Sequence, residues 1–145
     1  MTWGDAQRVD LAAAPSSVGE ARRFVRHALA AWHLEGVVDT VTLLTSELAT
    51  NAVVHAGTAF AVLVARDDNQ VLVEVLDGSV SQPHAQRPGP EATNGRGVGL
   101  VDALASAWGV TPADRLGHFA KGVWFTVPVA GVEESVWDGD WLADL

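Results

Sequence analysis

The sequence predicts an α+β domain, a two-layer sandwich in which a mostly antiparallel mixed sheet carries helices on one face. Two observations lead to this prediction. Apolar residues recur at helical spacing over two segments in the first part of the chain. The period then changes to β-rich runs, which read as a hairpin, a further helix and another pair of strands.

A short strand and a first helix are expected before residue 36. The run AQRVDL, residues 6–11, can form a strand. Ser17 and Glu20 have the spacing of a capping box, which predicts a helix N-terminus. Gly36 is expected to end this helix. Three arginines lie off its apolar face and form a local basic patch: Arg22, Arg23 and Arg26.

A second helix is expected from Asp39, a residue suited to an N-cap, to His55, with Gly57 just past its end. At helical spacing, Glu47 and Asn51 fall on one face of this helix, one turn apart. Apolar residues flank them on both sides: Leu43, Leu44, Leu48 and Val54. A carboxylate and an amide inside an apolar stripe cost free energy unless something pairs with them. The sequence therefore predicts a partner for these two side chains.

The second half of the chain predicts the rest of the sheet. Its expected elements are strands at 58–66 and 70–77 joined as a hairpin, a helix over 99–108, and strands near 109–112 and over 121–129. The segment 78–97 is polar and rich in Pro, Gly and Asn, and so long an irregular segment is more often functional than idle. We expect one domain over residues 1–130 and an acidic, Trp-containing tail over 131–145.

Composition excludes several classes of protein. The 145 residues suit one domain with a real core. With 18 acidic and 9 basic residues, a net charge of −9, the chain lacks the electrostatic footprint of a nucleic-acid binder. Uninterrupted apolar runs fall short of the ~18 residues of a membrane span. No cysteine is present, and no basic start precedes an apolar stretch, so we expect a cytoplasmic protein.

Four features carry residue types suited to nucleotide chemistry. An amide oxygen such as that of Asn51 suits Mg²⁺, and Glu47 can position or deprotonate an attacking hydroxyl. Asp77, an acid at the end of an apolar strand, can accept a hydrogen bond from an exocyclic amine such as that of adenine. The glycines of 95–100 open a helix, whose free N–H groups and positive dipole end suit phosphate. Lys121 can lie near phosphate.

Each feature also has an ordinary structural alternative. A lone Asn in a helix is usually a surface or capping residue, and an Asp after a strand usually starts a turn. Glu47 can pair with an arginine, and alternating glycines often mark only a turn. Together, in this order and spacing, the four features indicate nucleotide chemistry far more specifically than any one of them does alone.

At the level of motifs, the chain resembles the histidine-kinase-like ATPase (GHKL) superfamily, and within it the single-domain anti-sigma-factor serine/threonine kinases of bacteria. SELATNAVVHA matches the N-box, E-x-x-x-N-A-x-x-H. VEVLDGS resembles the first glycine box, GRGVGLV the second, and KGVWFTVP the closing strand. The resemblance covers about residues 7–128 and implies the corresponding fold, with ATP and Mg²⁺ as cofactors.

The resemblance implies a role for each motif residue. Asn51 would hold Mg²⁺ bridging the phosphates, Glu47 would be the general base, and Asp77 would bind the adenine amine directly and through water. His55 belongs to the same motif, and we interpret it as a packing residue or as one that supports the residues in contact with the ligand. The second glycine box would bind the nucleotide and shape a lid over its phosphates, through Gly95, Arg96, Gly97, Val98, Gly99 and Leu100. The chain departs from the family's D-x-G in having Asp77-Gly78-Ser79, which bears on the shape of the adenine pocket.

The function implied is that of a kinase acting by partner switching. Such a protein holds a sigma factor inactive and phosphorylates a serine or threonine of an anti-anti-sigma protein. The alternative is a nucleotide-binding module, weak or inactive in catalysis, that acts only by sequestering a partner; a scaffold whose glycines are merely turns is a third. The arginines of the first helix can meet an acidic protein partner, and homodimerisation is common in these kinases. We expect no direct nucleic-acid or membrane partner.

Overall fold

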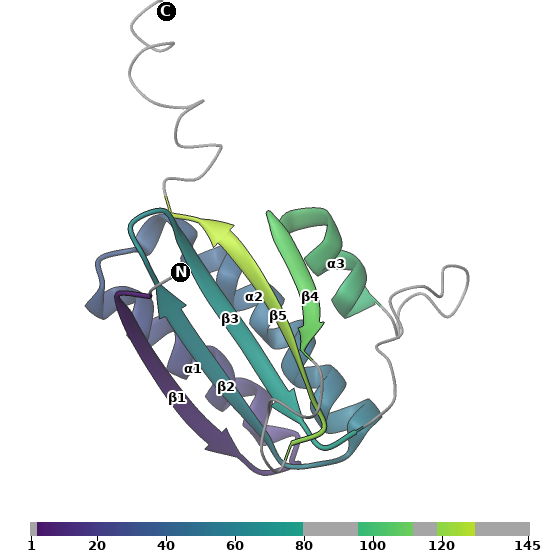
Figure 1. Cartoon of the computed structure of the whole chain (residues 1–145). Helices are drawn as coiled ribbons and strands as arrows, with labels where there is room; N and C mark the ends of the chain where they lie inside the picture. Colours follow the sequence, from purple (N-terminus) through teal and green to yellow (C-terminus); the bar gives the residue numbers. More distant parts are fainter. Residues whose placement is uncertain (1–2, 80–95, 112–118, 130–145) are drawn as a thin grey trace, which may run out of the picture.

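Five strands form one sheet in the computed structural model, which describes residues 3–79, 96–111 and 119–129 (Figure 1). Their order across the sheet is β1-β2-β3-β5-β4, and each neighbouring pair is antiparallel. The strands are β1 (Asp5–Leu11), β2 (Phe60–Arg66), β3 (Gln70–Asp77), β4 (Ala107–Thr111) and β5 (Lys121–Pro128). The predicted α+β class is confirmed, although no parallel pair joins the described strands.

All the long helices lie on one face of this sheet (Figure 1). They are α1 (Ser16–Ala31), α2 (Val38–Thr50) and α3 (Arg96–Leu104), with a 3₁₀ turn η1 (Glu35–Val37) before α2 and a π-helical segment η2 (Asn51–Ala56) after it. The central helix α2 packs against α1 on one side and α3 on the other, and it also contacts β3 and β5. The sandwich therefore has two layers, with α2 at the centre of the helical one.

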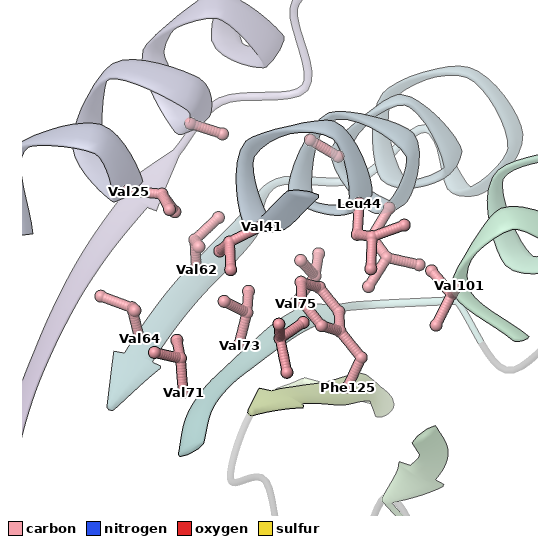
Figure 2. Packing of buried hydrophobic residues seen from close by; sticks show 14 of the residues in the cluster. Val25, Val41, Leu44, Val62, Val64, Val71, Val73, Val75, Val101 and Phe125 are labelled. Atoms are coloured by element: carbon pink, nitrogen blue, oxygen red, sulfur yellow. The ribbon is translucent and has the colours of Figure 1, made fainter. Parts of the chain in front are cut away.

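The core lies between the two layers because alternate residues of the central strands point toward the helices (Figure 2). These inward residues are Phe60, Val62 and Val64 of β2, Val71, Val73 and Val75 of β3, and Val123, Phe125 and Val127 of β5. Leu44 of α2 and Val101 of α3 contribute to this core from the helical layer (Figure 2). Continued to the strand ends, the same alternation places Asp77 and Lys121 on the helix-covered face.

The start of α1 differs from the predicted capping box. The helix begins beside the expected position, but no side chain caps it, and Ser17 is buried inside the first turn. Backbone hydrogen bonds close this turn instead, from Ser17 N–H to the Ala14 carbonyl (2.9 Å) and from Val18 N–H to the Pro15 carbonyl (3.2 Å). Because no side chain caps the helix, the spacing of Ser17 and Glu20 has no capping role.

The end of α1 also differs, since the helix stops at Ala31 and not at Gly36. His33 takes the left-handed conformation (φ 60°) that usually falls to glycine. Its N–H donates to the Ala30 carbonyl (3.1 Å), and the Leu34 N–H donates to the Leu29 carbonyl (2.9 Å). This is a Schellman motif with histidine in the left-handed position. The prediction places the end of α1 at Gly36 because glycine is the usual residue in that position.

The boundaries of the other helices are shifted for local reasons. The 3₁₀ turn η1 leads into α2, so Asp39 lies in the first turn of the helix and is not its N-cap. Gly57 follows the helical stretch in the left-handed conformation, as predicted. The third helix ends at Leu104 because Ser106 N–H already donates to the Thr126 carbonyl of β5 (2.8 Å), which starts the strand pairing there. The strand β4 accordingly begins earlier than expected.

One stretch, Glu35–Ala56, is long and apolar enough to cross a membrane by length and composition. Counting only uninterrupted apolar residues does not find it, because threonines and Glu47 interrupt the run. In the fold this stretch is the central helix of the domain, and Val41, Leu44 and Leu48 on it are buried against the sheet. Core helices of domains commonly pass this test, so it carries no argument for a membrane segment.

Candidate functional site

The first part of the site is an ion pair at the ends of β3 and β5. Asp77 and Lys121 stand directly opposite each other in the strand register. The Lys121 Nζ lies 3.0 Å from Oδ1 and 3.3 Å from Oδ2 of Asp77. Only 7% of the Asp77 side chain and 11% of the Lys121 side chain are exposed. Both side chains lie on the helix-covered face, so the pair is sheltered from water at the edge of the core.

The turn after β3 holds this ion pair in place. The Ser79 N–H donates to Asp77 Oδ1 (2.8 Å), and the Ser79 carbonyl accepts from Lys121 Nζ (3.2 Å). The Gly78 N–H donates to the Thr58 hydroxyl (2.9 Å), and the Ala120 N–H donates to the Asp77 carbonyl (2.8 Å). Backbone on both sides of the carboxylate is therefore fixed, and Asp77 does begin a turn as well as face the core.

The second part of the site is the polar face of the central helix. Glu47 and Asn51 are both half-buried. Within the described part of the chain, neither side chain makes a hydrogen bond or an ion pair. The alternative in which an arginine neutralises Glu47 is not seen there, because the nearby Arg22 guanidinium donates to the Ser46 hydroxyl (3.0 Å) instead. These two polar side chains, one turn apart at the edge of the core, thus have no partner among the residues that the structure describes.

The apolar stripe around these residues is narrower than the sequence predicts. Leu44 and Leu48 are buried as expected, but Leu43 is 41% exposed and Val54 is 64% exposed. Glu47 and Asn51 therefore border the core on one side and open space on the other. Solvent reaches both side chains, which lowers the free-energy cost that an isolated carboxylate would have inside the stripe.

A change of helix type occurs where Asn51 begins the segment η2. The Thr50 hydroxyl donates to the Ser46 carbonyl four residues earlier (2.8 Å), a contact that bends helices. The chain then continues with π-helical geometry, and the Gly57 N–H donates to the Ala52 carbonyl five residues earlier (2.9 Å). Single π-helical turns inside α-helices occur often at functional sites. No residue pattern in the sequence predicts this change of helix type.

The two parts lie in one region, because η2 contacts β3 and α2 contacts both β3 and β5. The third predicted part, the second glycine box, begins at the third helix. That helix starts at Arg96, three residues before its predicted start, so Gly97 and Gly99 lie inside its first turns. Leu100 is half-buried, and Val101 after it is in the core. Gly95 and the segment before it lie outside the described residues.

Lys121, predicted to lie near phosphate, makes its contacts with Asp77 and with the turn after β3. Its ammonium group binds Asp77, the residue predicted to bind adenine, because register puts the two directly opposite each other. The two residues are separated by 44 positions in the sequence, so only the strand register reveals the pair. The period-2 pattern of both strands could have placed them on the same face.

These residues fit an adenine nucleotide and a magnesium ion. A buried carboxylate and ammonium suit a base edge that carries both a donor and an acceptor, while the unpaired Asn51 amide suits a hard cation. The described residues contain no cluster of three acidic or histidine side chains. A magnesium ion at Asn51 would therefore be held chiefly by phosphate oxygens and water, as is usual for this ion.

Comparison with known families agrees with this chemistry. The family model of the histidine kinase-like ATPase domain matches residues 11–115, most of the chain, and the protein belongs to that family. An ATPase domain implies ATP binding, and the matched segment contains Glu47, Asn51, Asp77 and the third helix. No curated protein gives a significant match to the chain.

Proposed function

We propose that this protein is an ATP-dependent serine/threonine protein kinase that acts as an anti-sigma factor by partner switching. The family supports ATP-dependent phosphotransfer. The observation that carries the finer proposal is the pair Glu47 and Asn51, which have the spacing of a base and a magnesium ligand and no partner within the described residues.

Each residue has a defined task in this proposal. Asn51 would hold the magnesium ion, which would supply charge neutralisation during phosphoryl transfer. Glu47, one helical turn away, accepts the proton of the attacking hydroxyl. Asp77 accepts a hydrogen bond from the amine of adenine. The N-terminal turn of α3 directs backbone N–H groups and the positive end of its dipole toward phosphate. Catalysis then consists mainly of positioning and charge stabilisation.

The exposed face of α1 supports a protein partner of acidic character. Arg23, Arg26 and His27 line a shallow hollow on this helix, together with Ala30. In a chain of net charge −9 this basic patch has the opposite sign to the whole. We propose it as the contact surface for a sigma factor or its antagonist, at which charge complementarity gives specificity and speed of association. Charge reversal by Arg23→Glu should weaken binding to such proteins of the source organism and leave ATP affinity unchanged.

The test of the site is calorimetric titration of ATP, with magnesium and with EDTA, into the wild type and Asn51→Ala. We expect magnesium to tighten ATP binding to the wild type and to have no such effect on the variant. Thr40→Ala, a change at a half-buried position of the same helix, is the control for general disturbance. Wild-type protein that binds ATP but transfers no phosphoryl group would favour the sequestering module. Absence of any ATP binding would overturn the proposal.

A further inference from the structure

Asp77 and Lys121 do not use all of their hydrogen-bonding capacity on each other. Oδ1 of Asp77 accepts from Lys121 Nζ and from the Ser79 N–H, at 3.0 and 2.8 Å. Among the described residues, Oδ2 has only the longer contact with Lys121, at 3.3 Å. An ionised carboxylate offers about four acceptor sites, so Oδ2 can accept at least one further donor. The carboxylate therefore has an open acceptor site on one oxygen.

Lys121 is in a matching position. Its ammonium has three protons, and its contacts are Asp77 Oδ1 (3.0 Å), the Ser79 carbonyl (3.2 Å) and Asp77 Oδ2 (3.3 Å). The longest and weakest of these is the one to Oδ2. If another donor takes Oδ2, the third proton of the ammonium is released for another acceptor. The pair can thus bind a ligand that presents one donor and one acceptor side by side, while the closest contacts between Asp77, Lys121 and Ser79 remain.

The Watson–Crick edge of adenine presents that pair of groups, because the 6-amino group donates and the adjacent ring nitrogen N1 accepts. We propose that Lys121 is a base-recognition residue whose ammonium donates to N1 of adenine while Oδ2 of Asp77 accepts from the 6-amino group. The inference rests on the proposed ATP site. In this proposal Lys121 contacts the base at N1, next to the 6-amino group, and not the phosphates as predicted from the sequence.

Charge and specificity both agree with this assignment. A carboxylate buried alone opposite a neutral base would be costly, whereas the ion pair has no net charge. A base with a carbonyl at position 6 and a hydrogen on N1 reverses both groups. Its 6-carbonyl oxygen would face the Asp77 carboxylate, and its N1–H group would face the Lys121 ammonium. Sites built on hydrogen bonds reject such a reversal of donor and acceptor strongly. Inosine triphosphate, which differs from ATP in this edge, should therefore bind far more weakly than ATP.

The test uses 1-deaza-ATP, in which a C–H group replaces N1 and the 6-amino group stays. Calorimetry should show that the wild type binds 1-deaza-ATP at least ~10-fold more weakly than ATP, the effect of one hydrogen bond to a charged donor. In Lys121→Met, which keeps most of the length of the side chain and removes the donor, ATP should bind as weakly as 1-deaza-ATP binds to the wild type. Lys121→Arg, which keeps a donor and the charge, should restore part of the preference.

A second measurement needs no variant. Lys121 is the single lysine of the chain, so ¹⁵N-lysine labelling gives one side-chain Nζ signal. We expect ATP to shift this signal and 1-deaza-ATP, at saturation, to shift it less. Equal affinity of the wild type for the two nucleotides, or a preference for ATP that survives in Lys121→Met, overturns the inference and leaves the ATP site intact. Failure of the wild type to bind ATP overturns both.

Discussion

The two polar pairs of this domain differ in how their charges are balanced. At the strand ends, Asp77 and Lys121 are buried and are bonded to each other and to the adjacent turn. On the central helix, Glu47 and Asn51 are half-buried, and within the described residues nothing binds them. The first pair is therefore part of the folded structure as well as of the site. The second contributes little to folding and is suited to a ligand that arrives later.

This difference predicts that the two pairs fail in different ways when they are mutated. A change at the strand ends should be seen first in stability, because it leaves a buried charge without a partner. A change on the helix should be seen in chemistry, because the side chains are not needed for packing. The predictions below test this separation from the largest expected effect to the smallest.

The largest effect should come from Glu47→Gln, which keeps the shape of the side chain and removes the base. General-base catalysis typically contributes about 10²- to 10⁴-fold, so we expect phosphoryl transfer from ATP to slow by that factor. Single-turnover measurement with labelled ATP gives the rate, and calorimetry and urea unfolding should show ATP affinity and stability close to wild type. An unchanged rate would remove Glu47 from the mechanism. Lost stability would show that the helix face is structural after all.

The next effect should come from Lys121→Met, which leaves the Asp77 carboxylate buried and unpaired. Removing one partner of a buried ion pair typically costs about 3–5 kcal/mol of unfolding free energy, measurable by urea denaturation. The matched control is Asp10→Asn, which breaks the other ion pair of the described residues. In that pair Arg8 and Asp10 are 43% and 71% exposed, so we expect a loss below about 1 kcal/mol.

A double variant sharpens this prediction. Combining Lys121→Met with Asp77→Asn removes both charges, so part of the lost stability should return. If the single and double variants unfold at the same urea concentration, the loss comes from packing of the lysine stem and not from the unpaired carboxylate. Equal losses for Lys121→Met and Asp10→Asn would mean that burial does not distinguish the two ion pairs.

The same contrast explains what the sequence could and could not predict. Glu47 and Asn51 lie four positions apart in one helix, so helical spacing alone places them on a common face. Asp77 was predicted as a site residue from its place after an apolar strand. Its pairing with Lys121 depends on the register of two strands that are far apart in the sequence, and local patterns do not determine that register. Gly57 was found because glycine favours the left-handed conformation, whereas His33 in the same conformation was missed.

The smallest effect concerns the end of the helical segment that carries Asn51. Gly57 has φ +67°, and no atom lies within 4 Å of an added Cβ, so Gly57→Ala would introduce only backbone strain. We expect it to cost about 1–2 kcal/mol of unfolding free energy.

Gly36 is the matched control, because its Cβ would also meet open space and its backbone is not left-handed. Gly36→Ala should leave stability unchanged or raise it by about 0.4–1 kcal/mol through the entropy of the unfolded chain. Urea denaturation of both variants gives this comparison, and magnesium-dependent ATP binding shows whether Asn51 is still presented correctly. Equal changes in stability would mean that the left-handed turn after η2 carries no strain. A Gly57→Ala protein could instead lose stability and keep magnesium-dependent binding. That result would show that the packing of α2, and not the left-handed turn after η2, sets the position of Asn51.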